Sequence, residues 1–383
     1  MQYRVFGKTG INVSILGFGA MRLPAKPDGV CDYELSVPIL RRAINLGINY
    51  FDSAYGYING TSEVAVGKAI KGYERSKLYL ATKIPSNDEA ESKPDLWRRK
   101  LEECLKRFDT PYIDFVHLHG LQWNAYNNHI SRPGWVMDEA RKAQAEGLIR
   151  NISFSSHDNL ENVLNLIDTG EFASLLLQYN YLDQHFDAAI AHAAEKGMGV
   201  AIMGPVAGGR LVTPQGVVMD SEGVLEMKTP ELALRFVWNN PNVGLALSGM
   251  STIEQLEENV TAAQRMGEMG DEERSRVQEL FEKNQKLADL YCTGCSYCMP
   301  CPNAVNIPEN FRYMNWFRVW GLEEEARKGY EGLTAEGRWT PWAGMISGLN
   351  ADACLECGEC EPKCPQNIHI IDQLNEVSRT LGK

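Results

Sequence analysis

Four polar side chains lie at or just beyond the ends of three strand-like segments. Asp52 closes the first apolar run and Tyr57 follows five residues later, Lys83 closes the second run, and His119 closes the third. A buried strand gains nothing from a charged or phenolic group, because burying such a group costs free energy unless it is paired. These residues therefore need a chemical explanation.

Together the four residues suit the reduction of a carbonyl group. A phenol with a pKa near ~10 donates its proton poorly unless the anion that it leaves is stabilised. Lys83 would stabilise the anion of Tyr57, and Asp52 would hold the lysine charged and in place. His119 would donate a hydrogen bond to the substrate oxygen, and the same set run backwards would oxidise an alcohol. Each residue alone has an ordinary structural explanation, but four matching roles on consecutive strand ends favour a site.

Two residues close to this set leave alternative assignments open. Tyr55 could serve as the exposed phenol in place of Tyr57. His117 lies two residues before His119, so strand alternation places both on one face, with His117 in the core or supporting His119.

The first 270 or so residues alternate strand-like runs with amphipathic helical segments, which predicts an α/β fold built as a closed (β/α)8 TIM barrel. Strands are expected at 15–19, 49–52, 78–82, 113–118, 149–155, 174–178, 199–203 and 243–248, after a hairpin within 1–15. Helices are expected at 34–46, 63–71, 96–108, 136–146, 159–167, 186–196, 230–238 and 253–266. An open doubly wound sheet would instead need a glycine-rich turn opening a helix, whereas 17–24 runs into Pro24. In a barrel, catalytic groups lie where strands end.

Length and charge limit the remaining choices. A chain of 383 residues suits one large domain and a smaller one, which we place at 1–285 and 286–383. The net charge of -12 argues against binding to nucleic acid or to an anionic membrane. No run approaches the ~20 apolar residues of a membrane span, and residues 1–7 lack the apolar block of a signal peptide. A cytoplasmic location is expected.

Eight of the ten cysteines lie beyond residue 290, in two motifs that both end in Cys-Pro. The first motif contains Cys292, Cys295, Cys298 and Cys301, and the second contains Cys354, Cys357, Cys360 and Cys364. In a reducing compartment such clusters indicate metal binding and not disulfides. The second motif has the spacing of bacterial-ferredoxin ligands, in which the fourth cysteine binds the other cluster.

Two [4Fe-4S] clusters with crossed ligands are therefore expected. One would be held by Cys292, Cys295, Cys298 and Cys364, and the other by Cys354, Cys357, Cys360 and Cys301. A pair of structural zinc sites is the alternative. The helical pattern around 311–328, between the motifs, resembles a small, mainly α-helical ferredoxin-type iron-sulfur domain. Cys31 and Cys104 lie outside both motifs, and Cys104 is expected to be an ordinary buried thiol.

The barrel region resembles the aldo/keto reductase family. Asp52 with Tyr57 five positions on, Lys83 in Ala-Thr-Lys, and His119 five residues after Asp114 match that family's catalytic tetrad in order and placement. The resemblance implies a nicotinamide-dinucleotide site. Its residues would be Gly19, Ser155, Ser156, Gln178, Met203, Gly204, Pro205, Gly208, Ser248, Gly249, Met250, Gln255, Glu258 and Asn259.

Five positions depart from the family pattern. Met203 replaces an aromatic ring that stacks on the nicotinamide in many relatives, and Ser156 replaces an asparagine. Gln255 stands where NADPH-using members often carry arginine, and Gly249 and Met250 replace a lysine-serine pair. Without a cation for the 2′-phosphate, NADH is at least as good a candidate as NADPH, unless a basic group from elsewhere serves.

The sequence thus predicts an NAD(P)H-dependent aldo/keto reductase-like oxidoreductase acting on a small carbonyl or alcohol substrate, for example a sugar or aldehyde. Its clusters would exchange electrons with a redox partner protein. Two alternatives stay open, an electron-transfer protein whose barrel binds a partner, and a reductase with purely structural clusters. Hydride transfer moves two electrons and a [4Fe-4S] cluster normally one, and no flavin motif is evident to couple them.

Overall fold

The chain forms two compact units. The first contains Met1–Tyr179, Gln184–Pro205 and Leu234–Glu268, and the second contains Asn180–Asp183, Val206–Ala233 and Met269–Lys383. The computed structural model describes residues 1–209, 211, 217–220, 223–266, 275, 279, 292, 294, 296–340, 344–366 and 368–382. The predicted boundary between residues 285 and 286 lies outside the described residues, so it stays a prediction.

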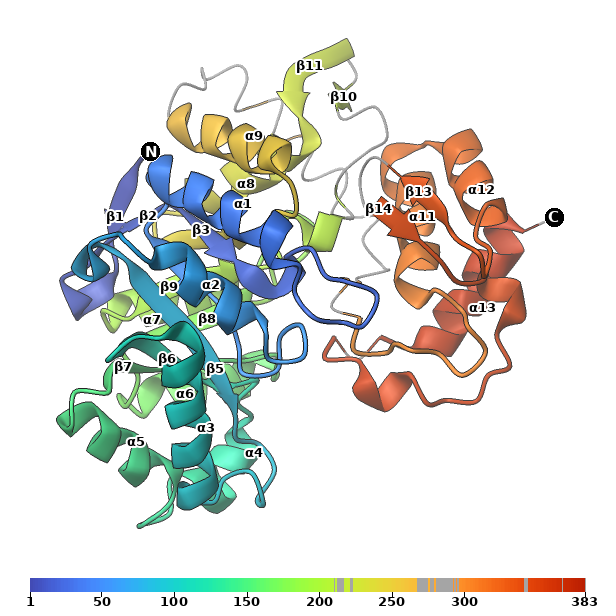
Figure 1. The fold of residues 1–383 in the computed structure, drawn as a ribbon. Helices are drawn as coiled ribbons and strands as arrows, with labels where there is room; N and C mark the ends of the chain where they lie inside the picture. Colours follow the sequence, from blue (N-terminus) through green and yellow to red (C-terminus); the bar gives the residue numbers. More distant parts are fainter. Residues whose placement is uncertain are drawn as a thin grey trace. The chain divides into compact units, whose positions relative to one another are not determined.

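The first unit contains a closed barrel of parallel strands in the order β12-β3-β4-β5-β6-β7-β8-β9 (Figure 1). Its strands are β3 (Leu16–Gly19), β4 (Tyr50–Asp52), β5 (Tyr79–Pro85), β6 (Ile113–His119), β7 (Ile149–Ser155), β8 (Ser174–Gln178), β9 (Gly199–Met203) and β12 (Leu245–Ser248). The antiparallel hairpin of β1 (Tyr3–Val5) and β2 (Asn12–Ser14) precedes them. The predicted (β/α)8 fold is confirmed.

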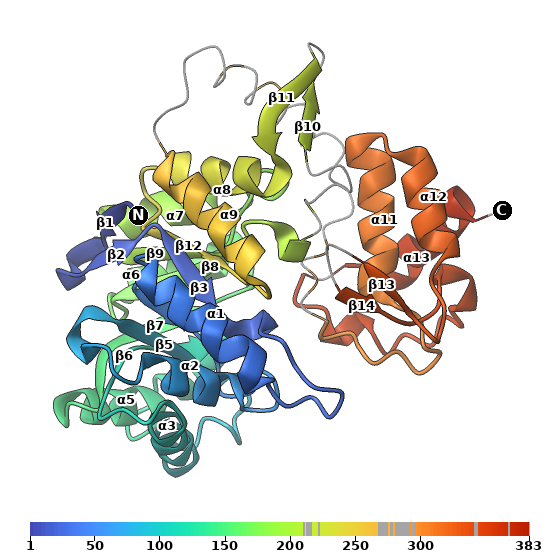
Figure 2. The ribbon, with the colours of Figure 1, turned by 45° about the horizontal axis from the view of Figure 1, so that its top comes forward.

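Helices alternate with the strands of the barrel, and Figure 2 shows α1, α2 and α3 beside the blue strands. They are α1 (Tyr33–Asn45), α2 (Ser62–Ile70), α3 (Pro94–Phe108), α4 (Trp123–Ala125), α5 (Val136–Ala145), α6 (Leu160–Asp168), α7 (Asp187–Glu195), α8 (Thr229–Asn239) and α9 (Ile253–Gln264). Side-chain caps begin several of them. Asp32, Asn159 and Thr252 accept hydrogen bonds from backbone N–H groups in the first turns of α1, α6 and α9.

Most element bounds match the sequence expectations to within two residues, but two strands are longer than predicted. β5 continues to Pro85 and β6 to His119, because Lys83 pairs with His117 and Pro85 with His119 in one continuous parallel ladder. Lys83 therefore lies inside its strand and does not close it. The short helix α4, which leads into a π-helical turn at Tyr126–Ile130, was not expected from the sequence.

An apolar floor fills one end of the barrel. Phe6, from the turn of the β1–β2 hairpin, packs its ring 5.9 Å from the ring of Tyr50 and 5.4 Å from the ring of Phe115. A Cβ on Gly199 or on Gly244 would come within 2.6 Å of the Phe6 ring, so both positions need glycine. The hairpin thus closes the bottom of the barrel, and the polar residues lie further along the same strands.

The second unit contains helices and two antiparallel strand pairs. Among the residues described there, the helices include α11 (Ile307–Trp320), α12 (Glu323–Glu331) and α13 (Ile370–Leu381), and the strands are β10 (Val217–Asp220), β11 (Gly223–Lys228), β13 (Arg338–Thr340) and β14 (Gly344–Ile346). Apolar side chains of α11, α12 and α13, among them Phe311, Tyr330 and Leu374, form one buried cluster. Cysteines of both motifs pack against it, and this C-terminal region is mainly helical, as predicted.

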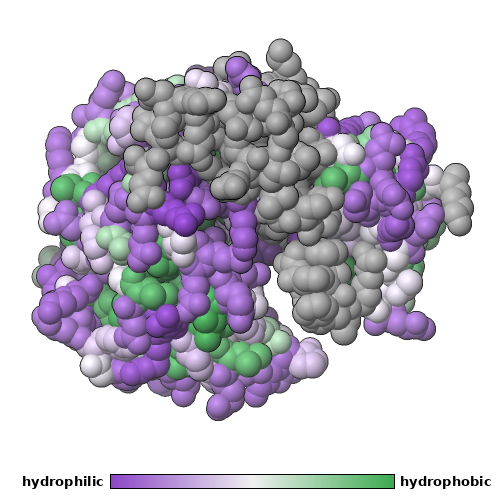
Figure 3. Space-filling view, turned by 90° about the horizontal axis from the view of Figure 1, so that it is seen from above, coloured by the Kyte–Doolittle hydropathy of each residue, from purple (hydrophilic) through white to green (hydrophobic). Residues whose placement is uncertain are grey.

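None of the described helices is both long and apolar enough to cross a bilayer. On the face shown in Figure 3, hydrophilic residues predominate among the coloured atoms, with small hydrophobic areas between them.

Candidate active site and cysteine cluster

Strand register brings the predicted catalytic residues to one end of the barrel interior. Tyr50, Ala81 and Phe115 all face the interior cluster. Asp52, Lys83 and His117 each follow one of these residues by two positions, so they face the interior one layer higher. Asp52 pairs with Ala81, and Lys83 pairs with His117.

Lys83 and Asp52 form a buried ion pair at this end. The Lys83 ammonium donates hydrogen bonds to Asp52 Oδ1 and to the carbonyl oxygen of Ser53, the latter at 2.7 Å. Only 2% of the Lys83 side chain and 5% of the Asp52 side chain are exposed. Burial raises the pKa of the Asp52 carboxyl, and the adjacent Lys83 charge opposes that rise. The lysine charge is thus held below the surface of the site.

Tyr57 and His119 lie above this ion pair. Lys83 Nζ is 4.8 Å from the centroid of the Tyr57 ring, and the Tyr57 and His119 rings meet edge to face with centroids 6.1 Å apart. Both residues are half-buried, whereas Asp52 and Lys83 are buried. Burial and the Lys83 charge lower the pKa of His119 to about 3, so its imidazole is neutral at ordinary pH. All four predicted catalytic residues therefore meet in one place.

The two alternatives from the sequence occupy other positions. The Tyr55 hydroxyl donates a hydrogen bond to Glu103 of α3 at 2.8 Å, so this phenol is engaged by a helix outside the barrel. His117 is fully buried and pairs in register with Lys83. Burial and the Lys83 charge lower the pKa of His117 to about 3. It is a neutral core residue beneath the site.

Two predicted cofactor residues, Ser155 and Ser156, support the loop that follows His119. Ser155 Oγ accepts a hydrogen bond from the backbone N–H of Gly120 at 2.9 Å. Ser156 Oγ donates to the carbonyl oxygen of Leu121 at 2.7 Å. The hydroxyl at the position that departs from the family asparagine is therefore used to hold a loop.

The ends of β8 and β9 bring Gln178, Met203 and Gly204 together. Gln178 and Met203 are register partners, and the next residue, Gly204, has a φ of 63°. A Cβ on Gly204 would collide with the side-chain amide of Gln178, so only glycine lets the backbone pass this close to the amide. Pro205 follows directly, and Gly208 lies in a short 3-10 turn, Ala207–Gly209, of the second unit.

The predicted adenosine-binding segment joins β12 to α9. Ser248 Oγ accepts a hydrogen bond from Asn259 Nδ2 at 3.0 Å, and Gln255 Oε1 accepts one from the Ser251 N–H at 2.8 Å. Met250 is fully buried, and a Cβ on Gly249 would lie 3.1 Å from Cδ of Arg22.

The two remaining members of the predicted site lie at the edges of this segment. Glu258 is exposed, and a Cβ on Gly19 would lie 3.5 Å from the Ser248 carbonyl oxygen. At Gly204 and Gly249 the absence of a side chain lets the backbone pass close to the side chains of Gln178 and Arg22.

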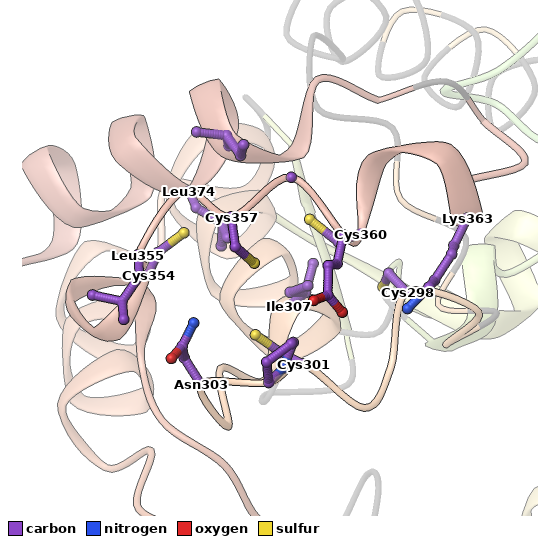
Figure 4. A pocket seen from close by; sticks show the side chains of 14 residues that line it. Cys298, Cys301, Asn303, Ile307, Cys354, Leu355, Cys357, Cys360, Lys363 and Leu374 are labelled. Atoms are coloured by element: carbon purple, nitrogen blue, oxygen red, sulfur yellow. The ribbon is translucent and has the colours of Figure 1, made fainter.

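Cysteines of both motifs line one pocket of the second unit. Its sulfur-bearing residues are Cys298, Cys301, Cys354, Cys357 and Cys360. Figure 4 shows the side chains of Cys301, Cys357 and Cys360 directed into a common space. Cys292 and Cys364 are half-buried and pack against the same apolar cluster, and Cys295 lies outside the described residues.

Among the side chains that the structure describes, no three His, Cys, Asp or Glu residues converge closely enough to hold one metal ion. The described thiols surround a space and do not meet at a point. Such a set fits an iron-sulfur cluster, in which each thiolate binds its own iron.

The two cysteines outside the motifs lie in the first unit and are both buried. Burial raises the pKa of the Cys104 thiol well above its ordinary value, as expected for an unreactive core thiol. Cys31 donates a hydrogen bond to Ser36 Oγ at 3.2 Å, and burial raises its pKa too.

Comparison with known proteins identifies both parts of the chain. The profile of the aldo/keto reductase family matches residues 15–216, which is more than half of the chain. This chain belongs to the aldo/keto reductase family. The profile of a 4Fe-4S dicluster domain matches residues 291–369, so the aldo/keto reductase barrel is followed by a ferredoxin-type iron-sulfur domain.

Relatives of this aldo/keto reductase match the barrel along most of their own length. L-galactose dehydrogenase of Arabidopsis thaliana is 28% identical over 312 residues, which cover 75% of this chain and 96% of the relative. The holo form of aldo-keto reductase AKR11C1 from Bacillus halodurans has a TM-score of 0.60 and 28% identity, and the match covers 73% of this chain and 96% of that one.

A second solved structure supports the fold alone. An aldo/keto reductase from Klebsiella pneumoniae in complex with NADP and acetate has a TM-score of 0.59 at 22% identity, covering 72% of this chain and 94% of that one.

Two further residues near the site carry no signal in the local sequence. Arg107 of α3 and Glu63 of α2 form an ion pair beside the loop that carries Tyr57. Arg107 is one of five basic residues in its helix, and nothing in the local pattern distinguishes it. Glu63 in the first turn of α2 resembles an ordinary helix-start carboxylate.

Proposed function

We propose that this protein transfers hydride between NAD(P)H and a small carbonyl or alcohol substrate, with Tyr57 as the general acid and base. The observation that carries the proposal is the buried Asp52–Lys83 ion pair directly beneath the Tyr57 ring, with neutral His119 at its edge. When bound, the nicotinamide supplies the hydride. Tyr57 gives its hydroxyl proton to the substrate oxygen and takes it back in alcohol oxidation.

Lys83, Asp52 and His119 would assist the transfer of the Tyr57 proton. The Lys83 charge favours the phenolate that Tyr57 becomes, because an adjacent cation stabilises an anion. Asp52 and the Ser53 carbonyl hold the ammonium in place. Neutral His119 donates one ring N–H to the substrate oxygen without adding a second positive charge. Since Tyr57 and His119 are half-buried whereas Asp52 and Lys83 are buried, a substrate would approach from the side of Tyr57 and His119.

For the dinucleotide, Gln178, Met203 and Gly204 would face the nicotinamide half, and the segment from Ser248 to Asn259 the adenosine half. Arg22 packs against Gly249 and places a basic group beside that second segment. Both NADH and NADPH therefore belong in the first assays.

We further propose two [4Fe-4S] clusters with crossed ligands. Cys301 shares a pocket with Cys354, Cys357 and Cys360, and these four thiols are the set that the crossed assignment gives to one cluster. Cys298, which that assignment gives to the other cluster, also lines the pocket, whereas Cys364 does not. Cys357 is exposed, so its cluster would lie near the surface, as exchange of electrons with a redox partner protein requires.

The acid role is tested by Tyr57→Phe, with Tyr73→Phe as the matched control because the Tyr73 hydroxyl bonds to Asn45 on α1 and not to the site. Tyr57→Phe should abolish carbonyl reduction while nicotinamide binding and iron content stay at wild-type levels. Wild-type turnover in Tyr57→Phe would overturn the role. A complete loss in Tyr55→Phe with activity retained in Tyr57→Phe would assign the acid to Tyr55.

The electron-transfer role is tested by anaerobic mixing of cluster-replete protein with NADH and then NADPH, following the iron-sulfur visible band and the nicotinamide absorbance together. Bleaching of the cluster band would support exchange of electrons between the two centres. An unchanged band, with nicotinamide consumed only after a carbonyl is added, would leave the clusters to a separate partner or a structural role.

A further inference from the structure

The loop that carries Tyr57 has an unfavourable backbone. Ile58, Asn59 and Gly60, the three residues after Tyr57, have φ values of 50°, 52° and 78°. The left-handed region disfavours β-branched residues in particular, so Ile58 is an outlier. A non-glycine residue such as Ile58 persists in this conformation only where the surroundings impose it.

Arg107 of α3 contacts this loop at two points. Its Nη1 donates to the backbone carbonyl oxygen of Tyr55 at 2.6 Å, and its Cζ lies 4.5 Å from the centroid of the Tyr55 ring. A Cβ on Gly60 would come within 2.8 Å of the guanidinium. Arg107 therefore contacts the loop on both sides of Tyr57, at Tyr55 and at Gly60.

Two carboxylates fix the guanidinium itself. Arg107 Nη1 is 3.1 Å from Glu63 Oε2, and Arg107 Nη2 is 2.5 Å from Glu103 Oε1. The Glu63 side chain is fully buried and also accepts a hydrogen bond from Thr82, the residue before Lys83 on β5. The chain of contacts thus runs from the strand that carries Lys83, through Glu63 and Arg107, to the loop that carries Tyr57.

We propose that Arg107, held by Glu63, is a positioning residue for Tyr57: it keeps the strained loop in the one conformation that places the phenol over Lys83. This inference rests on the proposed acid role of Tyr57. Lysine at position 107 keeps the positive charge, but it has one nitrogen and lacks the planar fork that contacts the Tyr55 carbonyl, Glu63 and Glu103 together.

The test compares Arg107→Lys with Arg98→Lys. Arg98 lies on the same helix, is 15% exposed against 17% for Arg107, and pairs with Glu139 and Glu146 away from the loop. Arg107→Lys should lower kcat about 10- to 100-fold, the scale of a misplacement of about 1 Å at a catalytic group, while KM and nicotinamide Kd change little. Arg98→Lys should behave as wild type.

Amide hydrogen exchange gives a readout that needs no substrate. The N–H groups of Tyr57, Gly60 and Thr61 bond within the loop, to the carbonyls of Ala54, Tyr57 and Ile58. These amides should exchange faster in Arg107→Lys than in wild type or Arg98→Lys. The double variant Glu63→Gln with Arg107→Met removes both charges and should show the same local effect if Arg107→Lys does not fold.

The outcomes separate the two proposals. Wild-type kcat in the Arg107 variants, or wild-type exchange of the loop amides, would overturn the positioning role while the acid role of Tyr57 stands. If the wild-type protein reduces no carbonyl, the proposed function fails, and the exchange rates still decide whether Arg107 holds the loop.

Discussion

Replacing Lys83 by methionine should destabilise the barrel in a manner that depends on pH. The substitution keeps most of the side-chain volume but removes the ammonium, and leaves the Asp52 carboxylate almost fully buried with no counter-charge. Removing one partner of a buried ion pair costs about 3–5 kcal/mol of the free energy of unfolding. The second acceptor, the Ser53 carbonyl, also loses its donor.

The sign of the pH dependence follows from Asp52. Burial already raises the pKa of this carboxyl, and without Lys83 nothing opposes the rise. A carboxyl whose pKa is higher in the folded than in the unfolded state destabilises the fold increasingly as pH rises from the unfolded value, about 3.9, to the folded one. The deficit of Lys83→Met relative to wild type should therefore be smaller at pH 5 than at pH 8.

The free energies of unfolding of Lys83→Met and wild type at the two pH values can be measured by denaturant unfolding. The fluorescence of Trp97 and Trp238, which are buried in the first unit, would follow the transition. Asp52→Asn combined with Lys83→Met should be less destabilised at pH 8 than Lys83→Met alone, because no charge is left buried. Lys77→Met removes an exposed ion pair on the same unit and should change little. A Lys83→Met deficit that is equal at both pH values, or strict additivity in the double variant, would refute the buried ion pair.

Four further substitutions test other parts of the molecule. Cys301→Ser and Cys364→Ser should each remove about half of the iron and acid-labile sulfide, since each belongs to a different cluster. Gly204→Ala should weaken nicotinamide binding in a fluorescence titration and lower stability by more than Gly170→Ala, which has a similar φ of 68° but open space around it. His117→Leu should flatten the pH dependence of unfolding between pH 6.5 and about 3, where wild type loses stability as pH falls because the unfolded histidine binds a proton and the buried one does not.

Each of these predictions has an outcome that would contradict it. Loss of all iron in Cys301→Ser would indicate a single cluster or fully cooperative assembly. Equal destabilisation in Gly204→Ala and Gly170→Ala would mean that the Gln178 amide moves aside without cost. An unchanged pH slope in His117→Leu would mean that His117 is protonated in the folded protein.

The local sequence pattern was sufficient to predict much of the fold and of the candidate site. Strands and helices were predictable because the barrel repeats one βα unit, and each unit carries its own periodicity and turns. The cysteine motifs were readable because cluster ligands are concentrated in short, fixed spacings. The four residues of the candidate catalytic set were also visible, since each lies at or shortly after the end of an apolar run of the sequence.

Only the tertiary structure decided which of two nearby phenols faces Lys83. Tyr55 and Tyr57 are two residues apart but make different contacts. Glu103 and Arg107, some fifty positions later in the chain, bind the hydroxyl and the backbone carbonyl oxygen of Tyr55. The ring of Tyr57 lies over the ammonium of Lys83 instead. Ser155 and Ser156 likewise bond to the loop after His119, which strand order brings beside them. Sequence determines which side chains are available, but contacts between distant segments select the conformations of the loops that hold them, and no local propensity encodes those contacts.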